Sequence, residues 1–282
     1  MLTATTPKPA AGLIYEPRGQ AGEYAALATN PYRGCGHGCA YCYVPAVLRM
    51  DRREFDAGAN LRPGYLQGLI KQAPKFAYGP QVMLSFTTDP YHPGDTSATR
   101  ATLQILAHHQ VPFCTLTKGG TRALRDLDLF RPHLDAFAAT LTTLDPAFSA
   151  KWERGAAPPS DRLEALRTFH RAGIFTWVSL EPTLDTEAAL ALIQHTHEFV
   201  DLYKIGRANY LPMTKTTDWQ AYTQRILELV NRLGVQHYIK RDLQPYLPAG
   251  YHNPLRVPQH HGPRPRHIPA GEHLPTQPAL AF

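Results

Sequence analysis

The sequence of 282 residues predicts an α/β protein, a partial (β/α)6 barrel in which strands and helices alternate along the chain. Short apolar runs rich in β-branched and aromatic residues alternate with longer amphipathic runs. The strand-like runs are almost continuously apolar, which is typical of a parallel sheet covered by helices. A glycine fingerprint for dinucleotide binding is missing, which favours a barrel over a doubly wound sheet. In such barrels the side chains that perform chemistry follow the C-terminal ends of the strands.

The elements can be placed in order along the chain. One strand is expected before a cysteine-containing loop at 30–43, and the strands after it are predicted over 82–87, 112–117, 136–143, 174–180 and 200–205. Amphipathic runs predict helices over 97–109, 121–131, 160–172, 186–198 and 217–233. Ser160-Asp161 is a helix start signal, and Gly173 and Gly234 stand where two of the helices should end.

Three regions are expected from the composition. Residues 1–25 read as a poorly structured lead-in, and residues 26–242 as the barrel domain. From residue 243 to 282 the chain is rich in proline and histidine. Because proline at this frequency prevents helices and central strands, we expect a tail that is disordered or draped over the surface.

Hydropathy and charge indicate where the protein is located and what kind of substrate it could bind. The sequence has no run of eighteen apolar residues that could span a membrane. Its beginning lacks the apolar stretch of a secretory signal, so we expect a cytoplasmic protein whose thiols stay reduced. The net charge of +6 and the pI near 9.1 are compatible with an anionic substrate such as nucleic acid.

The cysteines carry the most specific signal. Cys35, Cys39 and Cys42 lie in the loop NPYRGCGHGCAYCY, whose glycines and proline allow the backbone to wrap closely around a bound group. Their C-x3-C-x2-C spacing predicts a soft metal centre that is one ligand short of a tetrahedral zinc site or a four-cysteine cluster. The remaining cysteine, Cys114, stands in the apolar run VPFCTLT and is interpreted as a small buried hydrophobic residue.

Two alternatives remain from the residues alone. His37 could be the fourth ligand of a structural zinc, or Cys114 could complete an ordinary electron-transfer cluster. Paired C-x2-C knuckles are absent, and His37 is squeezed between two ligands, which speaks against zinc. The rival function is therefore a zinc- or iron–sulfur-bearing nucleic-acid-binding protein without catalysis, and metal content distinguishes it from an enzyme.

The C-x3-C-x2-C loop, with aromatic Tyr41 before the last cysteine, resembles the radical S-adenosylmethionine (SAM) superfamily. The resemblance implies that Cys35, Cys39 and Cys42 bind three irons of a [4Fe–4S] cluster. The fourth iron is then open to the amino and carboxylate groups of S-adenosylmethionine. It further implies a 5′-deoxyadenosyl radical that abstracts hydrogen, and an external one-electron reductant of the flavodoxin or ferredoxin type.

Residues 28–210 are similar to the spore photoproduct lyase-like group, through strings such as TTDPYHP, TLTKGG and WERGAAPPSDRLEAL. This similarity implies that Tyr41 lies against the cofactor, that Thr88 and Lys118 contact S-adenosylmethionine, and that Thr140 supplies a further hydroxyl. Glu153 and Arg162 match family positions without an assigned role.

The residues themselves agree with a site at the strand ends. Lys118 could pair with the methionine carboxylate, and Asp89 could accept from its ammonium group. Further polar residues follow the later strands, and we expect them to bind the cofactor ribose or the substrate: Glu181, Lys204 and Arg207.

One departure limits the resemblance. Photoproduct lyases have a hydrogen-donating cysteine three residues before the aspartate of this strand-end motif, and this chain has Phe86 there. Tyr43 matches a tyrosine of their hydrogen relay and is the candidate catalytic residue. The sequence therefore predicts a radical enzyme of unknown substrate and not a photoproduct lyase.

Overall fold

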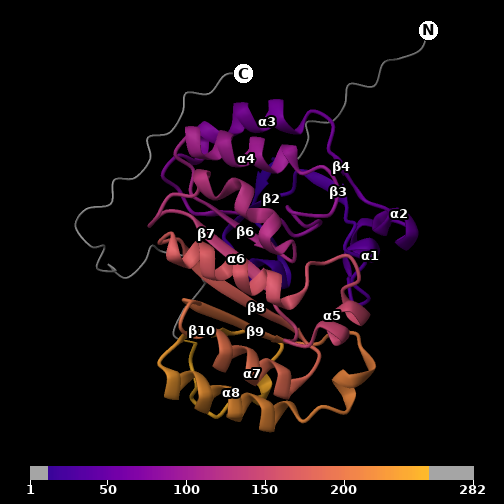
Figure 1. Cartoon of the computed structure of the whole chain (residues 1–282), viewed down its shortest axis with the longest axis vertical. Coiled ribbons are helices and arrows are strands. Elements are labelled where there is room, and N and C mark those ends of the chain that lie inside the picture. Colours follow the sequence, from indigo (N-terminus) through magenta and orange to yellow (C-terminus); the bar gives the residue numbers. More distant parts are fainter. Residues whose placement is uncertain (1–11, 254–282) are drawn as a thin grey trace.

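The computed structural model describes residues 12–253, and within them one sheet has the strand order β1-β2-β5-β6-β7-β8-β9-β10 (Figure 1). Its strands are β1 (Ile14–Tyr15), β2 (Leu27–Thr29), β5 (Val82–Leu84), β6 (Phe113–Thr117), β7 (Ala136–Thr140), β8 (Phe175–Thr183), β9 (Leu202–Arg207) and β10 (Gln236–Ile239). All neighbours from β2 to β10 pair in parallel, and only β1 on β2 is antiparallel. A separate hairpin joins β3 (Tyr32–Gly34) to β4 (Ala59–Leu61).

The predicted fold class, an α/β partial barrel, is confirmed. The expected strands correspond to β2 and β5 to β9, and the sheet is extended by β1 and β10, which were not predicted. Strand β5 ends at Leu84, before the predicted residue 87, because the Asn30 side chain accepts hydrogen bonds from the amides of Phe86 and Thr87 at 2.8 and 3.1 Å. These two residues therefore leave the ladder and begin a loop.

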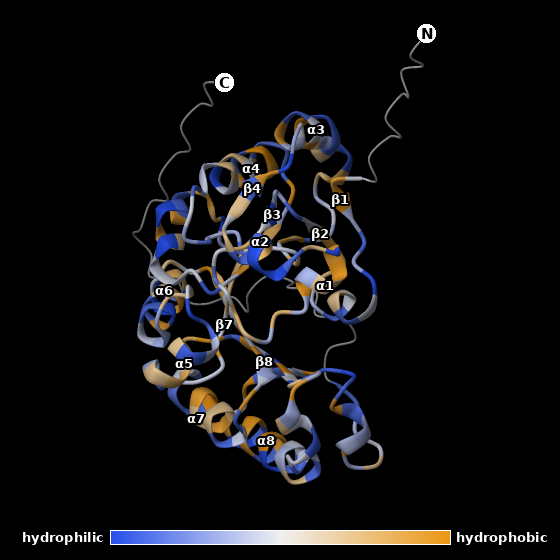
Figure 2. Cartoon of the chain, turned by 90° about the vertical axis from the view of Figure 1, so that its right-hand side faces the viewer, coloured by the Kyte–Doolittle hydropathy of each residue, from blue (hydrophilic) through white to orange (hydrophobic). Residues whose placement is uncertain are grey.

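Helices cover the outer face of the sheet (Figure 1). They are α3 (Tyr65–Gln72), α4 (Ser97–His108), α6 (Pro159–Arg171), α7 (Thr186–Thr196) and α8 (Trp219–Leu233). The shorter α1 (Val44–Leu48), α2 (Arg52–Asp56) and α5 (Pro146–Trp152) lie at one side of the molecule (Figure 1). Four of the five predicted helices, all except 121–131, match α4, α6, α7 and α8 within a few residues. Apolar stripes on α7 and α8 are visible in Figure 2, and such stripes bury against the sheet.

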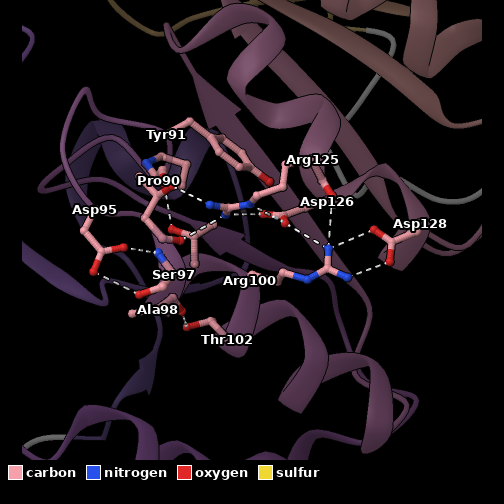
Figure 3. Close-up of polar contacts among 12 residues, drawn as sticks. Pro90, Tyr91, Asp95, Ser97, Ala98, Arg100, Thr102, Arg125, Asp126 and Asp128 are labelled. Atoms are coloured by element: carbon pink, nitrogen blue, oxygen red, sulfur yellow. Dashed lines mark hydrogen bonds and ion pairs between the residues drawn. The ribbon is translucent and has the colours of Figure 1, made fainter. Parts of the chain in front are cut away.

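The predicted helix over 121–131 is instead the 3₁₀ helix η3 (Gly120–Leu129). Its carboxylate Asp126 is fully buried and accepts from Arg100 and Arg125 at 3.1 and 2.8 Å (Figure 3). A hydrogen bond also fixes the start of η3, because the amide of Thr121 donates to Asp161 of α6 at 3.0 Å. We attribute the tighter winding to these contacts, which fix the segment at both its start and its middle.

The inner wall of the barrel changes from apolar to polar toward the strand ends. Side chains of a strand alternate between faces, so the register of β7 to β10 defines layers. One layer contains Ala138, Trp177 and Leu202, which pack in an apolar cluster. The next layer is Thr140, Ser179, Lys204 and Tyr238, and above it lie Glu181, Gly206 and Lys240.

The segments at both ends of the described residues add elements to the barrel. Residues 14–25, expected to be poorly structured, form β1 and the 3₁₀ helix η1 (Gly19–Glu23), because Ile14 and Tyr24 are buried against the sheet. After residue 243 the chain forms η5 (Gln244–Tyr246), and Asn253 bonds both backbone groups of Ile239 at 2.7 and 2.8 Å. The rest of the expected lead-in (1–11) and tail (254–282) lies outside the described residues.

Within residues 12–253, none of the helices has the length and apolar character needed to cross a membrane.

Candidate functional site

The three cysteines of the loop lie directly after β3. Cys35 and Cys39 are buried and Cys42 is partly exposed. Gly34 begins the loop with φ +89°, and a Cβ there would collide with the carbonyl oxygen of Gly58, so only glycine fits. The amide of Cys35 donates to the Phe55 carbonyl at 2.8 Å, and that of Cys42 to the Cys39 carbonyl at 3.0 Å. The three cysteines thus lie on one fixed loop, although within residues 12–253 no three His, Cys, Asp or Glu side chains are already grouped as a metal site.

The chemistry of these thiols suits a metal centre. Burial raises the pKa of Cys35 to about 12 and that of Cys39 to about 11, and it also raises the pKa of Cys42. Ligation to iron would remove these protons, because the thiolate is the ligand. Three soft donors on a glycine-rich loop fit a cluster that keeps one iron open.

Arg52 of α2 fixes the carbonyl groups of the same loop. Its Nη2 donates to the Cys39 carbonyl at 2.5 Å and its Nη1 to the Cys42 carbonyl at 3.5 Å. Asp56 holds the guanidinium through Nε at 2.6 Å. Arg52 could not be identified from the sequence, because its surroundings have the pattern of an ordinary charged helix.

The two alternative fourth ligands face elsewhere. The His37 ring places Nδ1 3.3 Å from Asp89 Oδ2 and Nε2 3.2 Å from Arg122 Nη2, so both nitrogens are engaged. Cys114 lies fully buried on β6, where its Sγ accepts from Trp177 Nε1 at 3.2 Å. The interpretation of Cys114 as a buried hydrophobic residue is confirmed. In this arrangement neither His37 nor Cys114 is free to act as a fourth ligand beside the three loop cysteines.

Thr88 and Asp89 tie the loop to the end of β5. Thr88 Oγ1 donates to the Gly34 carbonyl at 2.5 Å, immediately before Cys35. Asp89 accepts from the amides of Tyr91 and Lys118 at 2.8 and 2.7 Å and from Thr117 Oγ1 at 2.5 Å.

With His37, these donors engage the whole acceptor capacity of the Asp89 carboxylate. Burial disfavours the ionised form, but His37 and the hydrogen bonds outweigh it, so the pKa of Asp89 lies below its ordinary value. A direct bond from Asp89 to an ammonium group, as expected from the sequence, would require one of these donors to leave.

Lys118 follows β6 and points toward the cysteine loop. Its Nζ lies 5.5 Å from the centre of the Tyr41 ring. Burial favours the neutral amine, but the nearby Cys39 and Glu153 outweigh it and raise the pKa of Lys118. Gly119 is required after it, since a Cβ would lie 2.5 Å from the Cβ of Tyr91.

A buried ion pair lies behind Tyr41. The Tyr41 hydroxyl donates to Glu153, and Glu153 Oε2 is 2.7 Å from Arg162 Nη1. Arg162 also donates to the carbonyl of Thr140 at 3.0 Å, at the end of β7. Glu153 and Arg162, which had no role from the sequence, therefore connect Tyr41 with Thr140.

The far side of the barrel mouth carries a second set of charges. Glu181 accepts from Lys240 Nζ and from the Tyr24 hydroxyl. Gly206 lies between the pair, and a Cβ there would come within 3.0 Å of both side chains. Glu181 was predicted from the sequence, whereas Lys240 and Tyr24 were not, because they are distant from Glu181 in the chain.

Lys204 differs from its expected position after the strand. Strand β9 continues to Arg207, so Lys204 lies inside the wall, one layer below Glu181. Its Nζ donates to the Tyr24 carbonyl at 2.5 Å and lies 4.2 Å from the centre of the Trp177 ring. Burial lowers the pKa of Lys204 well below its ordinary value.

Arg207 and Tyr43 lie at the edge of the site. Arg207 ends β9 and donates to Asn209 Oδ1 and the Tyr246 hydroxyl, both at 3.2 Å. Tyr43 precedes α1 and is 55% exposed. Burial of its hydroxyl end and the charge of Glu181 raise the pKa of Tyr43 to about 12.

Comparisons with known proteins agree with this geometry. A family model described as the Radical SAM superfamily matches residues 29–188. Uncharacterized protein ORF301 of Acidianus two-tailed virus is 31% identical over 160 residues, 53% of this chain and 53% of that protein. Uncharacterized protein Rv2578c of Mycobacterium tuberculosis (strain ATCC 25618 / H37Rv) is 28% identical over 166 residues, 55% of this chain and 48% of that protein. The chain spans about half the length of these curated relatives.

Solved structures share the fold at low identity. A spore photoproduct lyase mutant with dinucleoside spore photoproduct has a TM-score of 0.59 and 14% identity, with 76% of each chain covered. Streptococcus suis SuiB bound to S-adenosylmethionine has a TM-score of 0.56 and 12% identity, covering 75% of this chain and 49% of that one.

The Asp89 contacts can be tested by Asp89→Asn. The amide puts an N–H against one pair of buried donors, so we expect the free energy of unfolding of the iron-free protein to fall by about 1–3 kcal/mol. Urea denaturation under reducing conditions measures this loss. Asp95→Asn is the matched control, because Asp95 caps an exposed turn through Ser97 and asparagine caps equally well. Equal stability of the two variants would contradict the role of Asp89.

Proposed function

The chain belongs to the radical SAM superfamily, and from that premise we propose that it abstracts a hydrogen atom from its substrate, using a [4Fe–4S] cluster and S-adenosylmethionine. One observation carries the proposal. Three free thiols lie on a loop that Thr88, Asp89 and Glu153 fasten to the strand ends of a partial barrel. Active sites of barrel enzymes lie at these ends.

We assign the cofactor contacts residue by residue. Cys35, Cys39 and Cys42 would hold the cluster. Residues matched through the family would contact S-adenosylmethionine, and these are Tyr41, Thr88, Lys118 and Thr140. When bound, the cluster supplies the electron that cleaves S-adenosylmethionine and yields the 5′-deoxyadenosyl radical.

The chain's own residues would prepare the site for this chemistry. Lys118 carries a positive charge next to the loop, which suits the carboxylate of the cofactor. The apolar layer with Trp177 closes the barrel below, and exclusion of water protects a radical. Glu181, Arg207 and the deeper Lys204 are proposed contacts for the ribose or the substrate, and Tyr43 is the proposed catalytic residue beside the loop.

The substrate class is proposed from charge and from the neighbours. The net charge of +6 favours an anionic substrate, with nucleic acid as the first class to test. Among the structural neighbours, a spore photoproduct lyase mutant holds a dinucleoside photoproduct and SuiB holds a precursor peptide. A peptide is therefore the second class, and an external one-electron donor of the flavodoxin or ferredoxin type would supply the electron.

Metal content tests the proposal first. Anaerobically reconstituted protein should contain about four irons per chain, with sulfide, because three cysteines complete the cluster with an open iron. Alanine at Cys35, Cys39 or Cys42 should abolish the cluster, as measured by iron and sulfide analysis. Cys114→Ala is the control and should keep its iron. Stoichiometric zinc in protein purified without oxygen would support the rival reading as a binding protein.

Cofactor binding tests Lys118. Lys118→Met keeps an unbranched side chain of similar length but removes the positive charge. The affinity for S-adenosylmethionine should therefore fall roughly ten-fold or more. Calorimetry on iron-loaded protein measures this affinity. Lys71→Met on the distant α3 should bind as the unaltered protein does. Equal affinity of both variants, at equal iron content, would remove Lys118 from the site.

The absence of a thiol at Phe86 gives a negative expectation. Phe86 packs with Tyr24 in the inner apolar cluster, with ring centres 6.1 Å apart, and has no labile hydrogen. We expect reduced enzyme to form 5′-deoxyadenosine slowly, by uncoupled cleavage, yet not to repair thymine photoproducts cleanly. Chromatography of both products measures this. Multiple-turnover repair would show that another donor replaces the cysteine.

A further inference from the structure

We propose that Glu153 and Arg162 are positioning residues, which hold Tyr41, Cys39 and the end of β7 in one fixed arrangement around the cofactor. The inference rests on the proposed function, because it assigns these contacts to the binding of the cluster and S-adenosylmethionine. It adds to that function a buried ion pair to which the sequence assigned no role.

The backbone brings Glu153 beside the cysteine loop. Cys39 and Glu153 form an antiparallel bridge, and on either side the amide of Ala40 donates to Trp152 and that of Gly155 to His37, both at 2.8 Å. A Cβ at Gly155 would collide with the carbonyl oxygen of Gly36. The segment after α5 therefore pairs with the loop as a short ladder.

Both carboxylate oxygens of Glu153 are engaged. Oε1 accepts from the Tyr41 hydroxyl, and Oε2 lies 2.7 Å from Arg162 Nη1 and 3.3 Å from Ser149 Oγ. The Glu153 side chain is 0% exposed and that of Arg162 is 1% exposed. The pair is thus removed from water, where each charge depends on the other.

Arg162 fastens this group to the barrel. Its Nε donates to the Ala157 carbonyl at 2.7 Å and its Nη1 to the Thr140 carbonyl at 3.0 Å. Direct contacts therefore run from Tyr41 through Glu153 and Arg162 to Thr140. Tyr41 and Thr140 are two of the residues proposed to contact S-adenosylmethionine, so the pair fixes both sides of that site.

The energetics favour a positioning role over stabilisation alone. A buried ion pair is expensive to desolvate, and apolar residues of similar volume often stabilise a fold equally well. Apolar residues cannot, however, accept the hydrogen bond of the Tyr41 hydroxyl, nor can they place a carboxylate such as that of Glu153 beside Lys118. Partners that orient ligands of a metal centre typically change affinity or activity roughly 10–100-fold when they are removed.

The test replaces the pair without leaving a lone buried charge. The double variant Glu153→Gln/Arg162→Met is neutral and similar in volume, and Tyr41→Phe removes only the hydroxyl. The matched control is Arg131→Met/Asp135→Asn, which removes another ion pair of 2.7 Å, with a buried carboxylate, at the opposite end of β7. Iron content, thermal unfolding of iron-free protein, S-adenosylmethionine affinity and the electron paramagnetic resonance signal of the reduced cluster are measured for each.

We expect the Glu153/Arg162 variant and the control to lose similar stability. Only the former should bind S-adenosylmethionine roughly ten-fold or more weakly, with a cofactor-dependent resonance signal that is shifted or broadened. Tyr41→Phe should show part of this loss while keeping its iron, and its unfolding temperature should fall only modestly, because Glu153 Oε1 loses one donor. It also tests the inference if the double variant does not fold.

Unchanged affinity and signal in Tyr41→Phe and in the folded double variant would overturn the positioning role. In that case unaltered protein still binds iron and S-adenosylmethionine, so the proposed function survives. Unaltered protein that binds neither would overturn the proposed function and the inference together.

Discussion

The buried carboxylate of Asp89 is the contact on which the arrangement of the site depends. It joins His37 of the cysteine loop to the end of β6, where it accepts from Thr117 and the amide of Lys118. A charge this deeply buried is tolerated only when its hydrogen bonds are complete. The loop, the strand end and Lys118 must therefore adopt one geometry together, and displacing any of them would leave a buried acceptor without a donor.

Carboxylates paired with basic side chains recur around the barrel mouth. A carboxylate is held by a basic side chain after β5, after β7 and near the end of β8, in the pairs Asp89 with His37, Glu153 with Arg162, and Glu181 with Lys240. The first and third pairs join segments that are distant in the chain, and Glu153 brings the second pair to the distant Tyr41. Since a single buried charge is strongly destabilising, these pairs restrict the mouth to one arrangement. Rigid placement of this kind is what a site for a reactive radical requires.

Local patterns predicted the parts of the molecule that depend on local physics. Apolar periodicity located the main helices and most strands, and the spacing of Cys35, Cys39 and Cys42 located the loop. Contacts across the chain carried no such signal: Tyr24 meets Glu181 across 157 residues, and Glu153 meets Tyr41 across 112. Tertiary packing also explains why Gly120–Leu129 is a 3₁₀ helix and why Lys204 lies inside the wall.

The positions of the charged side chains determine how the net charge of +6 acts on a binding partner. In the barrel wall, Lys240 pairs with Glu181 and burial lowers the pKa of Lys204 well below its ordinary value, so these lysines add little positive charge to the lumen. Exposed arginines instead surround the cysteine loop, on β3, at the end of α1, on α2 and after α5; they are Arg33, Arg49, Arg53 and Arg154. Exposed charges steer an anionic partner over about a Debye length, roughly 8–10 Å at physiological salt. The basicity of the chain therefore bears on how a partner approaches this face, while the chemistry inside the barrel is set by the balanced polar wall.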